Sequence, residues 1–326
     1  MSPRDALLNV RDLNIFFKSS GKPVPVVSAL NFNIRESEIF GLAGESGCGK
    51  SITALSIMGI LPSNAYAGGE IFFGGRDLLR MNEEEKRRLR GNEMSMIFQE
   101  PMTSLNPVLT IGYQIAEVLV EHRGMTKKDA MDKATELLES IKIPSAGLRV
   151  KEYPHQMSGG MRQRVMIAMA IACNPRLLIA DEPTTALDVT IQAQILELLQ
   201  RLREERGMSL LFITHDLAII AENASRVGIM YAGRLVELAD TTEIFSNPCH
   251  PYTLGLLESM PKGKGIPLRP IAGTVPRPEE LPRGCKYSGR CKYSVAECDA
   301  AEPLFEQVSD NHFARCIRVN DIKAGL

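Results

Sequence analysis

The sequence predicts an α/β fold in which a sheet carries flanking helices, with a helical insertion and a small irregular tail that is rich in cysteine. Three observations predict it. Short apolar runs bounded by turn residues recur along the chain and read as strands. Between about 112 and 150 the apolar residues instead recur at three- and four-residue spacing, which indicates helices. After about residue 262 the composition shifts to Pro, Gly, Arg and Cys, so we expect a domain boundary there.

The size and charge of the chain narrow its class. A chain of 326 residues suggests two domains, or one large domain with an appendage. Its 38 Lys and Arg nearly balance its 39 Asp and Glu, so general attraction to nucleic acid or anionic lipid is not indicated. The N-terminus lacks the apolar stretch of a signal peptide, and the longest apolar run, Val165–Cys173, is too short to cross a bilayer. We therefore expect a cytosolic protein that reaches a membrane only through a partner.

The individual strands follow from apolar patterning. Residues 7–17 alternate loosely and predict a strand, and Gly21 and Pro23 mark a turn before the next one. The short apolar run Ile39–Ala43 leads into a glycine-rich loop and then a helix from Ser51. Three further runs predict buried strands: Met94–Phe98, Leu177–Ala180 and Leu210–Thr214.

The glycine-rich loop has a spacing that suits phosphate binding. The run Gly44-Glu45-Ser46-Gly47-Cys48-Gly49-Lys50-Ser51 fits G-x-x-x-x-G-K-[ST]. Glycines let the backbone N–H groups wrap phosphates, and the following helix directs its positive end at them. We expect Lys50 to bridge the β- and γ-phosphates and the Ser51 hydroxyl to ligate Mg²⁺. A chance glycine-rich turn is the alternative, and Cys48 is expected to be small filler rather than a reactive thiol.

A second strand ends in two carboxylates. Leu177-Leu178-Ile179-Ala180-Asp181-Glu182 is an apolar run followed by an acidic pair. In this position Asp181 would hold Mg²⁺ through its water shell, and Glu182 would polarise the attacking water as general base. An ordinary solvated turn is the alternative reading. The phosphate loop upstream favours the functional one.

Small residues lie near the start of another predicted helix, Val165–Ala172, and follow His155-Gln156-Met157 in the sequence. Ser158, Gly159 and Gly160 there offer N–H groups to an anion. Because the first loop already holds the chain's own nucleotide, this second anion site requires a nucleotide bound by a partner subunit. The sequence here resembles the ABC ATPase family, whose signature loop caps the γ-phosphate of the opposing subunit's ATP.

The resemblance implies a P-loop ABC ATPase core, with a mixed sheet, flanking helices, an antiparallel β part and a helical subdomain at about 100–165. Other landmarks of the family occur in the expected order. Gln99 matches the loop that senses the γ-phosphate, Mg²⁺ and the membrane subunit, and Asp188, in Ala186-Leu187-Asp188, matches the segment that crosses the dimer interface. His215 matches the switch histidine, Phe17 the aromatic that stacks on adenine, and Ile52 a further nucleotide-binding position. Singly, His215 and Phe17 have plainer readings as core or turn residues.

The signature departs from the family pattern at two positions. It reads Met-Ser-Gly-Gly-Met, where the family usually has Leu first and Gln last. Met157 is a volume-tolerant replacement. Met161 lacks the amide that can hydrogen-bond the opposing nucleotide.

Three stretches resemble the dipeptide and oligopeptide permease ATPases: Pro101-Met102-Thr103-Ser104-Leu105-Asn106-Pro107, Tyr153–Gln156 and His250-Pro251-Tyr252-Thr253. The resemblance implies a nucleotide-binding domain over residues 1–262 and a permease-type extension over 263–326. It also implies an importer with a second, often non-identical ATPase subunit, two transmembrane permease subunits and an extracytoplasmic peptide-binding protein, and no nucleic acid. The chain would then lie peripherally on the cytoplasmic side of the membrane. The first stretch would lie where the membrane subunits dock, or would be a plain turn.

Two other functions remain open at this point. An importer of nickel or another small solute shares the architecture, since specificity lies on other chains. A soluble ABC ATPase acting on nucleic acid or the ribosome is disfavoured, because such proteins carry two cassettes or a long coiled coil. This chain has one phosphate loop and no heptad run.

The tail carries four cysteines, Cys285, Cys291, Cys298 and Cys316, with five, six and seventeen residues between successive members. Four soft ligands suit an Fe–S cluster or tetrahedral Zn²⁺. Structural zinc sites usually bring closer pairs, so a [4Fe-4S] cluster accommodates this spacing better. Zinc, plain thiols and labile disulfides are the alternatives. The cations among these cysteines would offset the negative charge of a cluster: Lys286, Arg290 and Lys292.

Overall fold

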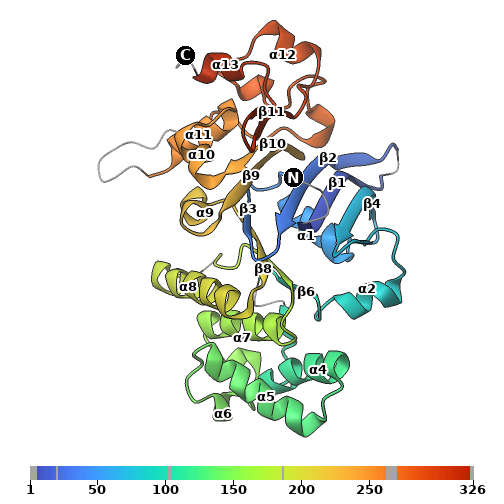
Figure 1. Ribbon diagram of the computed structural model, residues 1–326, viewed down its shortest axis with the longest axis vertical. Coiled ribbons are helices and arrows are strands. Elements are labelled where there is room, and N and C mark those ends of the chain that lie inside the picture. Colours follow the sequence, from blue (N-terminus) through green and yellow to red (C-terminus); the bar gives the residue numbers. More distant parts are fainter. Residues whose placement is uncertain (1–5, 20, 101–103, 186, 262–269, 324–326) are drawn as a thin grey trace. The chain divides into compact units, whose positions relative to one another are not determined.

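The computed structural model describes residues 6–19, 21–100, 104–185, 187–261 and 270–323. They fall into two compact units. The first unites Met1–Arg80 with Phe212–Leu326, and the second is Met81–Leu211. The second unit is therefore an insertion within the first along the chain (Figure 1). The predicted domain boundary near residue 262 lies within the first unit and stays a prediction.

An antiparallel sheet occupies the N-terminal part of the first unit. Its strand order is β2-β1-β4-β5. The strands are β1 (Ala6–Phe17), β2 (Val24–Arg35), β4 (Ala65–Phe73) and β5 (Arg76–Asp77). Buried and less buried residues alternate in part of β1, from Leu13 to Phe16, whereas Leu7 and Leu8 are both buried and Arg11 and Asp12 are both exposed. The strand predicted over residues 7–17 is confirmed.

A second set of strands in the first unit mixes parallel and antiparallel pairing. β3 (Ile39–Ala43) pairs in parallel with β9 (Arg226–Tyr231), which pairs antiparallel with β10 (Arg234–Asp240). All five residues of β3 are buried, which explains its continuous apolar sequence. Helix α9 (Leu217–Asn223) approaches β3 closely, because a Cβ on Gly41 would lie 2.7 Å from Ile220 Cδ1. The predicted α/β class with a mixed sheet is confirmed.

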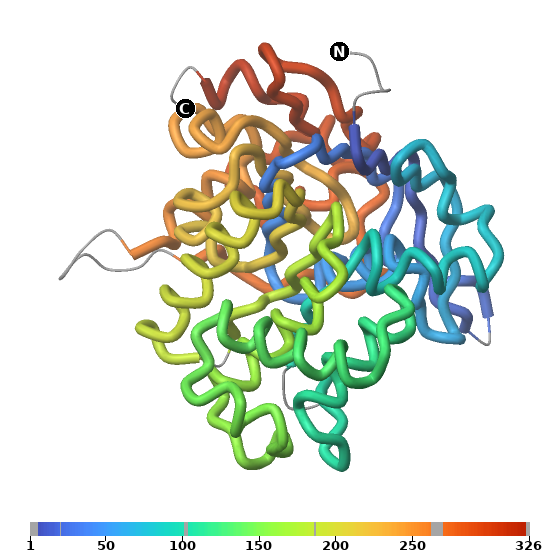
Figure 2. The backbone as a smooth tube through the Cα atoms, turned by 60° about the horizontal axis from the view of Figure 1, so that its bottom comes forward, coloured from blue at the N-terminus to red at the C-terminus, as the bar shows by residue number. Residues whose placement is uncertain are grey.

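The C-terminal residues fold back onto this set of strands (Figures 1 and 2). β12 (His312–Ala314) pairs antiparallel with β10 and with β11 (Glu306–Ser309). The rest of this region is built from short elements. They are α10 (Thr241–Ser246), α11 (Pro251–Ser259), η3 (Pro278–Glu280), η4 (Ser288–Arg290), α12 (Ala296–Ala300) and α13 (Val319–Lys323).

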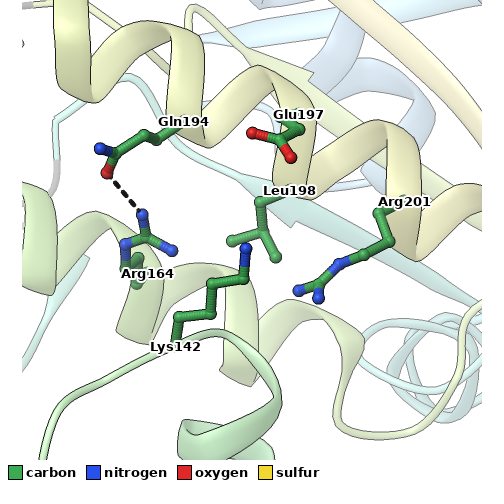
Figure 3. Close-up of a pocket in the computed structure, with 6 residues that line it drawn as sticks. All are labelled: Lys142, Arg164, Gln194, Glu197, Leu198 and Arg201. Carbon is green, nitrogen blue, oxygen red and sulfur yellow. Dashed lines mark hydrogen bonds between the residues drawn. The ribbon is translucent and has the colours of Figure 1, made fainter.

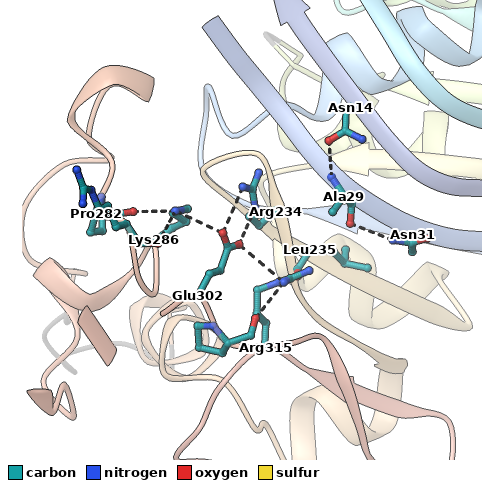
Figure 4. Close-up of polar contacts among 11 residues, drawn as sticks. Asn14, Ala29, Asn31, Arg234, Leu235, Pro282, Lys286, Glu302 and Arg315 are labelled. Atoms are coloured by element: carbon teal, nitrogen blue, oxygen red, sulfur yellow. Dashed lines mark hydrogen bonds and ion pairs between the residues drawn. The ribbon is translucent and has the colours of Figure 1, made fainter. Parts of the chain in front are cut away.

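One carboxylate links the C-terminal residues to β10. Glu302 accepts hydrogen bonds from Arg234 Nε at 2.6 Å and from Arg234 Nη2 at 3.3 Å. It also pairs with Lys286 at 3.4 Å and Arg315 at 3.7 Å, so that three cations converge on it (Figure 4). The sequence places these partners up to 81 positions apart, and the fold brings them together.

The second unit carries the predicted helical insertion. β6 (Met94–Ile97) pairs in parallel with β7 (Leu177–Asp181). Between them run α4 (Ile111–Arg123), α5 (Lys127–Ser140), α6 (Ala146–Arg149), η2 (Pro154–Gln156) and α7 (Gly159–Ile171), drawn in green in Figure 2. The unit also contains α2 (Glu83–Leu89) and α8 (Val189–Arg206), and β8 (Ser209–Thr214) leads back to the first unit.

The insertion helices begin and end as their sequences direct. Thr110 and Thr126 accept hydrogen bonds from Tyr113 N and Asp129 N, which caps α4 and α5. Gly124 ends α4 in the left-handed conformation that glycine favours. The helices predicted between about 112 and 150 are therefore confirmed. Among the described residues, no helix combines the length and the apolar character that a membrane span needs.

Candidate functional site

The phosphate loop connects β3 to α1 (Lys50–Met58) in the first unit. Three of its glycines take positive φ: Gly44 at 151°, Gly47 at 80° and Gly49 at 107°. A Cβ on Gly44 would lie 2.2 Å from the carbonyl oxygen of Met230, so no other residue fits there. The predicted strand–loop–helix unit is confirmed, although the helix begins at Lys50 rather than Ser51.

Lys50 is held inside the loop. Its Nζ donates to the carbonyl oxygens of Gly44 at 2.7 Å and Glu45 at 3.0 Å, and its side chain is almost fully buried. Cys48 is also buried, and burial raises the pKa of its thiol despite the neighbouring ammonium. A buried thiol with a raised pKa is a poor nucleophile, which fits the filler role expected for Cys48.

Glu45 makes contacts that the sequence did not reveal. Its carboxylate accepts two hydrogen bonds from Arg290, at 2.8 and 3.0 Å, and its backbone N–H donates to the Tyr252 hydroxyl at 2.9 Å. In the sequence, Arg290 stands out only as a cation among cysteines, and Tyr252 only as part of a stretch with family resemblance. No local signal in the sequence could have paired either residue with the loop.

The acidic pair and Gln99 meet in the second unit. Asp181 ends β7 and is buried, and Glu182 follows it with a positive φ of 45°. The Glu182 carboxylate accepts from Gln99 Nε2 at 3.0 Å and from Thr185 Oγ1 at 2.8 Å. A non-glycine residue in this conformation is strained, and such strain is concentrated at functional sites. The structure thus brings together two of the predicted site residues, Gln99 and Glu182.

The signature residues form the start of α7. Ser158 is the N-cap and accepts from Met161 N at 3.3 Å, and Gly159 and Gly160 are the first helical residues. A Cβ on Gly160 would lie 2.9 Å from Ile191 Cγ2 of α8, so this glycine allows the two helices to approach. The helix predicted over Val165–Ala172 therefore starts six residues earlier and ends at Ile171.

The remaining predicted residues have separate surroundings. Asp188 caps α8 by accepting from Ile191 N at 2.9 Å. His215 is exposed after β8, and Phe17 is half-buried at the end of β1, opposite Val24. Ser46 is exposed, and Ser51 and Ile52 are half-buried in the first turn of α1. Pro101–Thr103 and Ala186, which belong to stretches with family resemblance, lie outside the described residues.

The predicted site residues divide between the two units. Phe17, the loop from Gly44 to Ile52 and His215 belong to the first unit. Gln99, Ser158–Gly160, Asp181, Glu182 and Asp188 belong to the second.

The four tail cysteines line one cavity in the first unit, together with His250 and Tyr287. All are free thiols, and Cys298 is buried while the others are half-buried. Burial raises the pKa of Cys316 to about 12, and the neighbouring thiols add to that rise. Gly284 allows the backbone next to Cys285 to pass close to Cys298, because a Cβ at Gly284 would lie 2.1 Å from the carbonyl oxygen of Cys298. These cysteines are Cys285, Cys291, Cys298 and Cys316.

A second buried group unites Glu237, Cys249 and His312, whose ligand atoms lie within 4.8 Å of one another. His312 Nε2 lies 2.7 Å from Glu237 Oε1, and its Nδ1 lies 3.9 Å from Cys249 Sγ. Glu237 also accepts from the backbone N–H groups of Cys249 and His250, at 2.6 and 2.9 Å. These bonds already satisfy both carboxylate oxygens, so the group serves as a structural network that joins β10, α11 and β12.

A cavity of about 360 Å³ in the second unit is lined in part by Lys142, Arg164 and Arg201 (Figure 3). The two arginines bind backbone carbonyls at the end of a helix. Arg164 donates to the carbonyl oxygen of Ile141 and to Gln194, and Arg201 donates to the carbonyl oxygen of Ser140. These carbonyls end α5, where orphan acceptors and the helix dipole favour cations. The cavity contains none of the predicted site residues.

Known proteins share both the sequence and the fold. The ABC transporter profile matches residues 27–185, and that of the oligopeptide/dipeptide transporter C-terminal region matches residues 236–298. The oligopeptide transport ATP-binding protein AppD of Bacillus subtilis (strain 168) is 50% identical over 317 residues, covering 95% of this chain and 96% of AppD. The oligopeptide transport ATP-binding protein OppD of Escherichia coli (strain K12) is 46% identical over 316 residues, covering 96% of this chain and 94% of OppD.

Among solved structures, the dimeric post-hydrolysis state of the ATP-binding cassette MJ0796 bound to ADP and Pi matches with a TM-score of 0.64 at 26% identity. That match covers 72% of this chain and 98% of the cassette. The similarity to AppD and OppD extends over nearly the whole of each chain, and the match to the ABC transporter profile spans the phosphate loop, the acidic strand end and the signature. The chain therefore belongs to the ABC transporter family, in its oligopeptide and dipeptide branch, and is an ATPase.

Proposed function

We propose that this protein is the ATP-binding and hydrolysing subunit that energises an importer of dipeptides or oligopeptides. The observation that carries the proposal is similarity over nearly the full length to AppD and OppD, whose names describe oligopeptide transport. The profile match over residues 236–298 supports the same branch, because it covers residues beyond those that the ABC transporter profile matches.

The nucleotide site would use the predicted residues in distinct roles. Phe17 would stack on adenine, and the loop from Gly44 to Ile52 would wrap the phosphates. Lys50, which now donates to two loop carbonyls, would turn its ammonium to the β- and γ-phosphates. His215 would contact the γ-phosphate. These donors act mainly by holding charge that develops on the transferred phosphoryl group.

The metal and the attacking water would be held from the acidic strand end. Ser51, Gln99 and Asp181 would hold Mg²⁺, which supplies charge neutralisation at the phosphates when it is bound. Glu182 would accept a proton from the attacking water. The hydrogen bond from Gln99 to Glu182 supports this assignment, because it orients the carboxylate.

The partners follow from the signature and the family. Ser158, Gly159 and Gly160 would cap the ATP of a second ATPase subunit, and Asp188 would lie at the interface between the two. The dimeric cassette with ADP and Pi supports such an assembly. Two permease subunits would bind on the membrane side and a peptide-binding protein outside, so the chain would be peripheral on the cytoplasmic side. Import of nickel or another solute is a second candidate, and action on nucleic acid is not favoured by the names of the relatives.

The ATPase assignment is tested by replacing the proposed base. Glu182→Gln keeps the size of the side chain and its capacity to hydrogen-bond Gln99, but removes the proton acceptor. We expect ATP hydrolysis to fall about 10²- to 10⁴-fold while ATP binding persists. Phosphate release and equilibrium binding of ATP measure the two quantities. Hydrolysis at the unmodified rate in this variant would contradict the role of Glu182.

The transport assignment is tested separately by affinity purification from the source membrane. Co-purification with two membrane proteins and stimulation of ATP turnover by peptide with its binding protein support it. Stimulation by nickel alone, or by nucleic acid, would instead favour one of the other functions.

We further propose that the four tail cysteines hold a [4Fe-4S] cluster, with Zn²⁺ as the alternative. Three observations support the proposal. The four thiols line one cavity, they are free, and Gly284 lets the chain close around them. When bound, such a group supplies a negatively charged, redox-capable centre.

The cluster proposal is tested on anaerobically purified protein. We expect brown protein with about four irons and four acid-labile sulfides per chain, both lost in Cys298→Ser. Cys249→Ser serves as the matched control, since Cys249 is a buried thiol outside this cavity. Colourless protein with one zinc, or with no metal, would overturn the assignment.

A further inference from the structure

The C-terminal region reaches the phosphate loop through one arginine. Arg290 Nη1 and Nη2 donate to Glu45 Oε2 and Oε1, at 2.8 and 3.0 Å, so the pair is bidentate. The two residues lie 245 positions apart in the sequence but in the same compact unit. Fork-like pairs of this kind fix both position and orientation of a carboxylate.

The surroundings of Arg290 hold its guanidinium in place. Its side chain is 6% exposed, whereas that of Glu45 is 30% exposed. The guanidinium lies over the rings of Tyr231 and Tyr287, at 5.7 and 5.9 Å from their centroids, and its Nε donates to the carbonyl oxygen of Ala272 at 2.9 Å. An arginine with these contacts is preorganised, because little side-chain entropy remains to be lost.

All three polar parts of Glu45 are engaged. Its carboxylate meets Arg290, its N–H donates to the Tyr252 hydroxyl at 2.9 Å, and its carbonyl oxygen accepts from Lys50 Nζ at 3.0 Å. Tyr252 is fully buried and packs on Tyr231 at 4.7 Å between ring centroids. Glu45 thus joins the lysine of the loop directly to two residues of the C-terminal half.

We propose that Arg290 and Tyr252 are positioning residues for nucleotide binding, which set the conformation of the phosphate loop through Glu45. The inference rests on the proposed ATP site and extends it, because it makes the C-terminal region part of the machinery that shapes that site. The loop binds phosphate through backbone N–H groups, and their directions depend on how its residues are held.

The place of Arg290 in the chain adds a consequence. It ends η4, the short helix between Cys285 and Cys291, and its N–H donates to the carbonyl oxygen of Tyr287 at 3.0 Å. The backbone geometry between these two cysteines therefore determines where the guanidinium lies. Changes at that turn are transmitted to Glu45 by a single rigid side chain.

The test measures ATP affinity in the Glu182→Gln background, which separates binding from hydrolysis. A fluorescent ATP analogue, displaced by unlabelled ATP, gives the dissociation constant. We expect Arg290→Gln to weaken binding about three- to tenfold, and Arg290→Lys to restore part of the loss, since lysine supplies charge without the fork. Glu45→Gln should weaken binding similarly, and the double variant should be no weaker than either single one, because each removes the same pair.

Controls separate positioning from folding. Arg277→Gln removes an exposed arginine of the same region and should leave affinity unchanged. Thermal unfolding of every variant is measured alongside. Tyr252→Phe tests the second positioning residue, because it keeps the buried ring and removes the hydroxyl that accepts from Glu45 N–H.

The outcomes are distinguishable. Additive losses in the double variant, or equal ATP affinity in Arg290→Gln and its background, would overturn the inference. The inference would also be overturned if Arg290→Gln and Arg290→Lys lost the same ATP affinity and both variants showed the same fall in thermal stability. If the Glu182→Gln protein binds no ATP, and adding Lys50→Ala makes no difference, the result contradicts the proposed ATP site and not the role of Arg290.

Discussion

The carboxylate of Glu237 is completely buried, and donors from separate parts of the chain hold it. Backbone N–H groups of Cys249 and His250 supply two of its hydrogen bonds, and the imidazole of His312 supplies another. A buried carboxylate needs such partners, since an uncompensated charge in the interior is very costly. At the scale of single residues, this network adds side-chain contacts to the backbone pairing of β12 with β10.

The network predicts a pH dependence of stability. Burial by itself lowers the pKa of His312, but hydrogen bonds with Cys249 and Glu237 outweigh it and raise the pKa to about 9. Because the unfolded value is near 6.5, this stabilisation is complete below about pH 6.5 and is lost as the pH rises through about 9. Thermal unfolding from pH 6 to 10 should therefore show a fall that is absent in His312→Gln. A parallel pH profile in the variant would contradict the prediction.

At the scale of elements, close packing of the insertion helices depends on glycine. Gly112 lies in the first turn of α4, and a Cβ there would lie 2.3 Å from Val150 Cγ2 and 2.7 Å from Met131 Sδ. Its N–H also donates to the carbonyl oxygen of Val150 at 2.8 Å. In contrast, a Cβ on Gly147 of α6 would meet nothing within 4 Å. The neighbours of Gly112 therefore leave no room for a larger residue, whereas the space around Gly147 is open.

These glycines make a matched pair of variants. Gly112→Ala should lower the free energy of unfolding by about 1–3 kcal/mol through overpacking. Gly147→Ala should raise it by about 0.5–1 kcal/mol, because alanine favours the helix and no clash opposes it. Urea unfolding of the whole chain measures both changes. If both substitutions changed the free energy of unfolding equally, the side chains around Gly112 would have to move to accommodate the added methyl group, which would contradict the prediction.

At the scale of the whole molecule, residues far apart in sequence tie the C-terminal region to the strands of its unit. Glu302 is the centre of this link, since Arg234 of β10, Lys286 and Arg315 all converge on it (Figure 4). Burial raises the pKa of Glu302, but the hydrogen bond and charge of Arg234 and the other cations outweigh that effect and lower it. Its charged form is thus favoured in the folded protein.

Removing this charge should loosen the C-terminal region. Glu302→Gln leaves three partly buried cations without their counter-charge, so we expect a loss of about 1–3 kcal/mol in the free energy of unfolding. The exposed Glu306→Gln is the control and should change it by less than about 0.5 kcal/mol. Since the folded pKa of Glu302 is lowered, the difference between wild type and Glu302→Gln should exist above about pH 4.5 and vanish as the pH falls further. Urea unfolding at pH 7 and at successively lower pH values below about 4.5 measures the difference.

Local features of the site were predictable from the sequence. The phosphate loop is one run of consecutive residues, and the acidic pair directly follows an apolar strand, so both motifs carry their structural context with them. The same holds for β1, β3, β7 and the insertion helices, because the spacing of apolar side chains reflects which face of each element is buried. The ends of elements were predicted less accurately than their type. The helix predicted over Val165–Ala172 begins at Gly159, because the cap at Ser158 outweighs the low helix propensity of glycine.

The sequence by itself determined the α/β class, the phosphate loop, the acidic strand end and the signature, because each is encoded within a few consecutive residues. Only the tertiary structure decided that Arg290 and Tyr252 hold Glu45, and that Cys249 lies beside Glu237 and His312. The physical reason is the same in both cases. A hydrogen bond or ion pair depends on distance in space, and an arginine beside cysteines or an isolated cysteine has no local pattern that reveals its partner. Folding the C-terminal residues back onto β10 creates those proximities, and with them the contacts of the phosphate loop.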